Sequence, residues 1–154
     1  MLLESIVVLT LSLLKEAFAV PCTVPSLSMC DCSGTVVACR SNNLVQIPSS
    51  IPTDTTRLGL NQNKIQSIDA TSLSGLTSLE YLWMEYNEIS SIEDGAFSSL
   101  RSLKVLYIYD NKLTSIEPDI FKSLGSLVEL NLEYNELTTV SASIFAELTD
   151  IEEL

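Results

Sequence analysis

The sequence contains no histidine, the side chain that most often serves as a general acid or base near neutral pH. It also lacks the G-x-S-x-G nucleophile turn and the G-x-x-x-x-G-K phosphate loop. Carboxylates remain as candidates for catalysis or calcium binding, and we interpret them as a solvated acidic rim: Glu85, Asp110, Glu129 and Glu133. The sequence therefore predicts that the chain is not an enzyme and binds neither a cofactor nor a metal.

Positive charge is scarce. Lys and Arg number 8 against 20 Asp and Glu, so the formal net charge is −12. Interfaces with nucleic acid are built from Lys and Arg that neutralise phosphates, so we expect no nucleic-acid partner. Gly and Pro are also few, at five each, and 46% of the residues are hydrophobic, which is typical of a folded protein.

A hydrophobic run long enough to span a bilayer is missing as well. The stretch at residues 5–14 is ten residues long, and the A-x-A pattern of Ala17, Phe18 and Ala19 follows it. We interpret residues 1–19 as a cleaved signal peptide, although its only early charge is Glu4; the alternatives are an uncleaved anchor and a buried helix. The expected location is secreted or at the extracellular face of the plasma membrane.

The four cysteines all lie within residues 22–39, in a C-x7-C-x-C-x6-C arrangement. In an exported chain, an even number of clustered cysteines predicts two disulfides. A zinc site is the weaker interpretation, because histidine and paired C-x2-C knuckles are absent. Of the three pairings, the one that joins Cys30 to Cys32 would close a very small loop and is disfavoured; the residues alone do not decide between the others.

From residue 55 the chain repeats with a period of 24 residues and no insertions. The units are "TTRLGLNQNKIQSIDATSLSGLTS", "LEYLWMEYNEISSIEDGAFSSLRS", "LKVLYIYDNKLTSIEPDIFKSLGS" and "LVELNLEYNELTTVSASIFAELTD". Apolar positions alternate first and then spread out, so each unit is predicted to begin as a strand and to return through an irregular or briefly helical segment.

Equivalent positions of the four units predict the core. The inward strand positions are Leu58 and Leu60, Leu82 and Met84, Leu106 and Ile108, and Leu130 and Leu132. Further core positions are Ile65 and Ile68, Ile89 and Ile92, Leu113 and Ile116, and Leu137 and Val140, followed by Leu73, Phe97, Phe121 and Phe145. One polar column at the strand ends is predicted to satisfy turn backbone groups: Asn63, Asn87, Asn111 and Asn135.

The L-x-x-L-x-L-x-x-N-x-L pattern of "LEYLWMEYNEI" and "LVELNLEYNEL" resembles the leucine-rich repeat, and the following "FSSL" resembles its typical extracellular class. The cysteine cluster resembles the N-terminal cap of Slit-like proteins and variable lymphocyte receptors. This resemblance implies an α/β solenoid, a horseshoe with a parallel concave β-sheet and a mostly irregular convex side. It also implies disulfides joining Cys22 to Cys32 and Cys30 to Cys39.

The expected organisation has three parts: a signal peptide at 1–19, a cysteine-rich cap and linker at 20–54, and leucine-rich repeats at 55–154. Four repeats are complete and a fifth, "IEEL", is truncated. A solenoid needs a polar cap on its last turn. We therefore expect the sequence to be part of a longer protein with further repeats and a C-terminal cap, and a membrane anchor, if there is one, to lie in that missing part.

Aromatic rings gather at the strand positions between the inward leucines. All five tyrosines and the single tryptophan occupy such outward positions, whereas phenylalanine is absent from them. Amphipathic rings with few rotatable bonds are typical anchors of binding surfaces. The predicted ligand-binding residues are Tyr81, Trp83, Glu85, Tyr86, Tyr107, Tyr109, Asp110 and Tyr134.

The sequence thus predicts a secreted or cell-surface recognition module that binds an extracellular protein or glycan through its concave face. By resemblance, such a module serves as an immune-type receptor or in development and adhesion. The alternative is an acidic extracellular matrix protein whose charge binds calcium or mineral.

Overall fold

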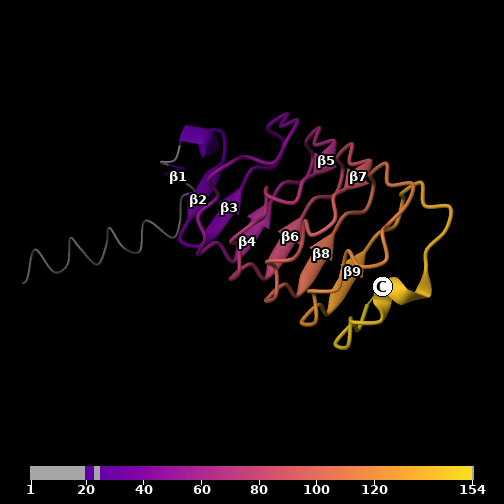
Figure 1. Cartoon of the computed structure of the whole chain (residues 1–154). Helices are drawn as coiled ribbons and strands as arrows, with labels where there is room; N and C mark the ends of the chain where they lie inside the picture. The colour runs from indigo at the N-terminus through magenta and orange to yellow at the C-terminus, as the bar shows by residue number, and fades with distance from the viewer. Residues whose placement is uncertain (1–19, 23–24, 154) are drawn as a thin grey trace, which may run out of the picture.

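The computed structural model describes residues 20–22 and 25–153. The predicted signal peptide at 1–19 lies outside the described residues and stays a prediction. Each 24-residue repeat forms one turn of a solenoid, with a short strand on one wall and a return segment on the other (Figure 1). Within the described part of the chain, no helix is both long and apolar enough to cross a membrane.

One sheet of seven strands forms the first wall, in the order β1-β2-β3-β4-β6-β8-β9. The first three strands are antiparallel and belong to the cysteine-rich segment: β1 (Val20–Pro21), β2 (Asp31–Ser33) and β3 (Val36–Ala38). From β3 onward all pairs are parallel, through β4 (Arg57–Gly59), β6 (Tyr81–Trp83), β8 (Val105–Tyr107) and β9 (Glu129–Asn131). The cysteine-rich segment therefore continues the sheet of the repeats.

The return wall is mostly irregular. It contains a small parallel sheet of β5 (Ser67–Ile68) and β7 (Ser91–Ile92), and the last return contains the 3-10 helix η2 (Ala142–Phe145). A second 3-10 helix, η1 (Pro25–Leu27), lies in the cysteine-rich segment. The fold predicted from the sequence, a horseshoe-type solenoid with a parallel sheet and a mostly irregular opposite side, is confirmed.

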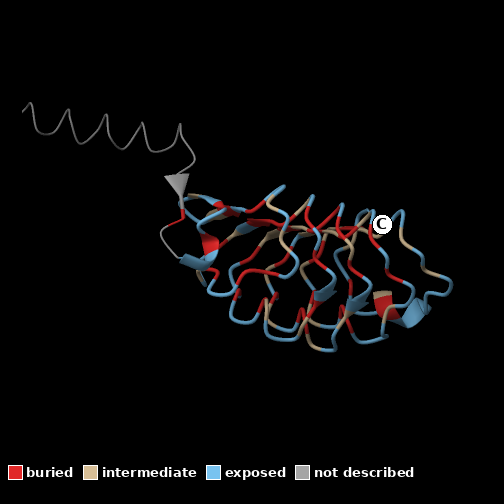
Figure 2. Ribbon diagram, turned by 90° about the horizontal axis from the view of Figure 1, so that it is seen from above, coloured by how far each residue is buried: buried red, intermediate tan, exposed pale blue. Residues whose placement is uncertain are grey.

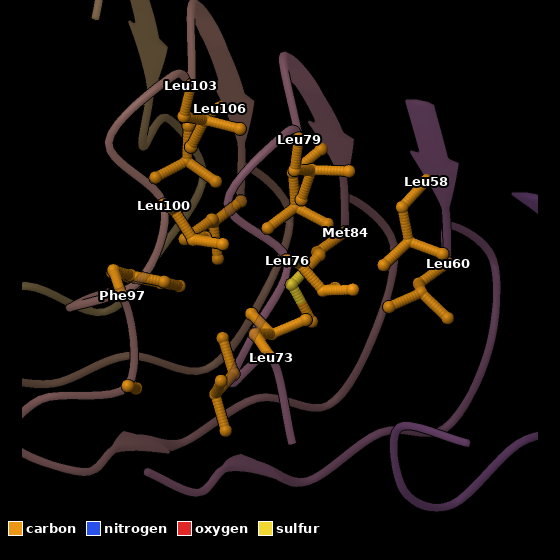
Figure 3. Close-up of a cluster of buried hydrophobic side chains, with 14 of the residues drawn as sticks. Leu58, Leu60, Leu73, Leu76, Leu79, Met84, Phe97, Leu100, Leu103 and Leu106 are labelled. Atoms are coloured by element: carbon orange, nitrogen blue, oxygen red, sulfur yellow. The ribbon is translucent and has the colours of Figure 1, made fainter. Parts of the chain in front are cut away.

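The core lies between the two walls. Buried residues run through the interior of the coil and exposed residues along its outer edges (Figure 2). Leu58 and Leu60 from the strand wall face the space that Leu73 and Leu76 fill from the return wall (Figure 3). Because every strand pairs in the same register, Leu58, Leu82, Leu106 and Leu130 form one continuous buried row.

The phenylalanine column is buried where a turn has neighbours on both sides. Phe97 and Phe121 are fully buried and stack with ring centroids 6.2 Å apart. Phe145 is half-buried and packs against the core, whereas the prediction that Val140 belongs to the core is wrong, because Val140 is 43% exposed. Both lie in the last return, which packs against a neighbouring turn on one side only.

The asparagine column is a hydrogen-bonded ladder, as predicted. The Asn87 amide Nδ2 donates to the carbonyl oxygens of Leu60 (3.0 Å) and Met84 (3.0 Å), and its Oδ1 accepts from the Ile65 N–H at 3.0 Å. Asn111 repeats this pattern one turn later. Each amide therefore joins two adjacent turns through backbone groups that the strand ladder leaves unpaired.

Two disulfides close the N-terminal end of the solenoid. Cys22 pairs with Cys32 and Cys30 with Cys39, which confirms the pairing implied by the resemblance. Cys30 and Cys39 are buried and belong to the same hydrophobic core as the leucines of the first repeat. The cap therefore covers apolar surface that the first repeat would otherwise expose.

Candidate functional site

The outward positions of β4, β6, β8 and β9, together with the residues just after each strand, form a surface that we call the concave face. Strand pairing sets its columns: Arg57, Tyr81, Val105 and Glu129 in one, and Gly59, Trp83, Tyr107 and Asn131 in another. Side chains alternate along a strand, so these residues point away from the leucine rows. The columns predicted from the sequence are those of the structure.

The rings of the concave face contact one another in two groups. Tyr81 and Trp83 stack with centroids 5.7 Å apart. Tyr109 lies 6.1 Å from Tyr107 and makes an edge contact with Tyr86 at 5.3 Å. The structure therefore brings together five of the predicted site rings, each of which keeps part of its surface in solvent.

Tyr134 and Asp110 lie at the end of the same face. Tyr134 is 77% exposed, and within the described residues it makes no ring contact with the other aromatics. Asp110 is exposed in the preceding turn. These two predicted site residues lie beside the ring groups and are not part of them.

The residue directly before each ladder asparagine has a left-handed backbone conformation. The φ angles are 56° at Gln62, 56° at Tyr86, 53° at Asp110 and 51° at Tyr134. A non-glycine residue in this region costs on the order of 1–3 kcal/mol. These residues lie in the turn that follows each strand, and both Tyr86 and Tyr134 are exposed there. The sequence pattern placed these residues on the face but did not signal their backbone geometry.

Glu85 departs from its predicted exposure. It was expected to stand in solvent between Asn61 and Tyr109, but the residue is only 7% exposed. Its Oε2 is buried and has no hydrogen-bond partner among the described residues. The alternation along the strand correctly predicted that Glu85 points outward, but an outward side chain is not always accessible to solvent. Neighbouring turns lie close enough for their side chains to cover the carboxylate.

Burial changes the acidity of Glu85. The loss of water around the carboxyl raises its pKa above the ordinary 4.5, while a backbone N–H, the Asn61 amide and the charge of Arg40 oppose that rise. Arg40 Nε donates to Gln62 Oε1 at 2.9 Å, and the ion pairs of the described residues, Lys104 with Glu80 and Lys112 with Glu88, do not include Glu85. The carboxylate is therefore short of compensating positive charge.

Two residues outside the predicted site hold rings in place. The Arg57 guanidinium lies 4.9 Å from the centroid of the Tyr81 ring, a cation–π contact. The Tyr107 hydroxyl donates a hydrogen bond to Glu129 Oε1, and this bond, with burial, raises the pKa of Tyr107 to about 12. The sequence could have indicated both contacts through the repeat columns, because Arg57 lies beside Tyr81 and Glu129 lies on the strand after Tyr107.

A hollow lies away from the rings, in the first turn of the solenoid. A cavity of about 340 Å³ is lined by the linker before the first repeat and by the return of that repeat, including Ser49, Ser50, Asp69, Ser72 and Leu76. Asp69 accepts hydrogen bonds from Thr71 and Ser72, which hold its pKa well below the usual range. These contacts satisfy the carboxylate within its own turn. Among residues 20–22 and 25–153, no cluster of three or more His, Cys, Asp or Glu suits a metal ion.

Comparison with known proteins gives a family match over most of the chain. The model described as leucine rich repeat matches residues 53–113 and 101–154. A crystal structure of a TLR13-ssRNA13 complex is similar, with a TM-score of 0.71 and 32% identity, over 76% of this chain and 17% of that chain.

Curated relatives are similar over shorter stretches. The chain is 37% identical over 82 residues to the chondroadherin-like protein of Homo sapiens, which is 53% of this chain and 10% of that protein. It is 44% identical over 50 residues to asporin of Bos taurus, which is 32% of this chain and 14% of asporin. Leucine-rich repeat-containing protein 52 of Mus musculus is 45% identical over 53 residues, 34% of this chain and 17% of that protein. The chain thus spans only a small part of the length of each relative.

Proposed function

The chain belongs to the leucine-rich repeat family, and from that premise we propose that it is a secreted or cell-surface recognition module whose concave face binds an extracellular protein or glycan. The binding residues are those predicted from the sequence: Tyr81, Trp83, Glu85, Tyr86, Tyr107, Tyr109, Asp110 and Tyr134. This is a role in binding, not in catalysis.

The observation that carries the proposal is the division of the aromatic residues. Phe97 and Phe121 are fully buried, whereas the single tryptophan and all five tyrosines lie on the concave face with part of their surface in solvent. The core therefore does not need these rings as filling. Rings with one polar atom supply large contact area at low conformational cost, which suits a binding surface.

The charge of the concave face favours a protein or glycan over a nucleic acid. The TLR13 structure is a complex with ssRNA. Here the described part of the concave face carries Asp110, Glu129 and Glu133, and the Arg57 guanidinium is already stacked on Tyr81. A phosphate backbone requires clustered Lys and Arg, so an uncharged or cationic ligand suits this surface better.

The two disulfides support an extracellular location, because such bonds persist in oxidising compartments. We accordingly interpret residues 1–19 as a signal peptide, 20–54 as the cap and linker, and 55–154 as the repeats. An immune-type receptor and an adhesion molecule both fit this organisation.

The proposal is tested by capture from extracellular material with the tagged full-length chain. Trp83→Ala and Tyr107→Ala should each remove the species that the wild type retains, because truncating a central ring in an interface typically costs about 2 kcal/mol or more. Val45→Ala is the matched control, since Val45 is 61% exposed and lies in the linker, away from the rings. Phe97→Ala calibrates stability, because emptying its core position should cost about 3–5 kcal/mol of unfolding free energy.

Two results would count against the proposal. If Trp83→Ala unfolds the chain as readily as Phe97→Ala, its ring belongs to the core. If both ring variants fold and retain the same species as the wild type, the concave rings do not bind it. Loss of the captured species in a calcium chelator, with no effect of either ring variant, would favour the acidic matrix interpretation.

A further inference from the structure

The concave face contains one buried carboxylate that the fold leaves incompletely paired. We propose that Glu85 receives the guanidinium group of an arginine side chain on a protein partner. This inference rests on the proposed function and deepens it, because it names the chemistry of the group that the concave face recognises. It treats the partner as a protein with an exposed arginine, not as a neutral glycan.

Glu85 has no structural task that would explain an acid at this position. The equivalent positions of the other turns hold Asn61, Tyr109 and Glu133, and all four turns keep the same strand register. Glu133 is exposed, whereas Glu85 is buried, with 7% of its surface in solvent. The fold therefore accepts an amide, a ring or a solvated acid here, and only in the second repeat is a carboxylate buried.

Burial of that carboxylate is unfavourable in the free chain. Oε2 has lost its water and has no hydrogen-bond donor within the described residues. Leaving a buried charged acceptor unpaired costs more than leaving a neutral one. Arg40 acts on Glu85 only through its charge, because the ion pairs of the described residues, Lys104 with Glu80 and Lys112 with Glu88, do not include Glu85. A cationic donor from a partner would supply both the missing hydrogen bond and the missing charge.

The surroundings favour guanidinium over ammonium. Glu85 is close enough to Tyr107 and Tyr109 for its charge to affect the acidity of both phenols. A planar guanidinium can bond a carboxylate while it stacks on a ring, which a compact ammonium does less well. Arg57 already makes such a contact with Tyr81 on the same face. Oε2 is closed to solvent in the free chain, so entry of the group requires side-chain rotations, which are common on binding.

The test uses small probes and the only tryptophan in the chain. N-acetyl-arginine methylamide, its lysine counterpart and its uncharged citrulline counterpart are titrated into the full-length protein, and Trp83 is followed by fluorescence and by its indole NMR signal. We expect a saturable response to arginine, a weaker one to lysine and none to citrulline. Glu85→Gln should weaken arginine binding by about tenfold or more, because one partner of a buried charge pair is lost.

Glu133→Gln is the matched control, because it removes the same charge from the exposed equivalent position two turns later. It should change arginine binding by less than about twofold, as expected for a solvent-screened charge. Glu85→Asn is a second variant, which introduces the residue that the preceding turn has at this position, Asn61. Circular dichroism checks that each variant is folded.

Three results would overturn the inference: no response of the wild type to arginine, equal responses to arginine and citrulline, or equal weakening by Glu85→Gln and Glu133→Gln. The last result would indicate only the general negative charge of the face. The inference can fail while the proposed function stands. If Trp83→Ala still abolishes capture of the extracellular species while Glu85→Gln leaves arginine binding unchanged, the concave face binds its partner without this contact.

Discussion

The buried carboxylate of Glu85 lowers the stability of the free protein at neutral pH. Because burial raises the pKa of its carboxyl, the folded chain holds this proton more tightly than the unfolded chain does. Its contribution to stability is therefore fully present below the unfolded value of 4.5 and is lost as the pH rises through the folded pKa. The charged form at neutral pH is the less stable one.

We therefore expect Glu85→Gln to be more stable than the wild type at neutral pH and to lose that advantage as the pH falls through the raised pKa of Glu85 toward 4.5. Urea denaturation over this pH range measures the free energy of unfolding of both proteins. Glu133→Gln, at the exposed equivalent position, should follow the wild-type profile. If Glu85→Gln has the same dependence of unfolding free energy on pH as the wild type, burial of the carboxylate does not lower the stability of the protein.

At the scale of the element, the asparagine ladder joins one turn to the next. The Asn87 amide pairs three buried backbone groups that belong to two turns. Each such group costs about 1–3 kcal/mol when it is left buried and unpaired. Asn135 makes equivalent bonds, but it is only half-buried, so water can replace them.

Asn87→Ala should accordingly lower the unfolding free energy by several kcal/mol, about the sum of the unpaired groups. Asn135→Ala should lower it by clearly less. Thermal and urea unfolding of the two variants give the comparison. Equal losses of unfolding free energy in the two variants would mean that the contribution of a ladder asparagine does not depend on its burial.

The repeating elements were the most predictable part of the molecule. The 24-residue period determines where Leu82 and Leu106 pack, and alternation within a strand determines that Trp83 and Tyr107 share a column. The exposure of Val140 and the burial of Glu85 escaped prediction for one reason. Both depend on what the neighbouring turns place beside the residue, whereas a pattern within one repeat reports only which way its side chain points.

At the scale of the whole molecule, the cap and the repeats form one cooperative stack. The sheet runs without interruption from β1 to β9, and the cap cysteines share the hydrophobic core of the first repeat. In a solenoid each turn is stabilised mainly by its neighbours, so the loss of one end weakens the turns that follow. The disulfides therefore support more of the chain than the segment they close.

Replacing Cys30 and Cys39 together by serine should destabilise the protein by about 2–5 kcal/mol, the usual effect of losing a native disulfide from a small domain. Hydrogen exchange should show the loss of protection first at Leu58 and Leu60, which pack next to the cap. The corresponding replacement of Cys22 and Cys32 should have the smaller effect, because Cys32 is only half-buried. Four free thiols in the folded wild-type protein would contradict this account.

The uniform register of β4, β6, β8 and β9 also bears on how such a chain can change over generations. Any crossover between two repeats at matching positions joins a strand to the same kind of neighbour, so the leucine rows and the asparagine ladder survive the exchange. Only the residues displayed between the leucines differ afterwards. Recombination can therefore produce new arrangements of tyrosine, tryptophan and acid on the surface while the scaffold that supports them is inherited intact.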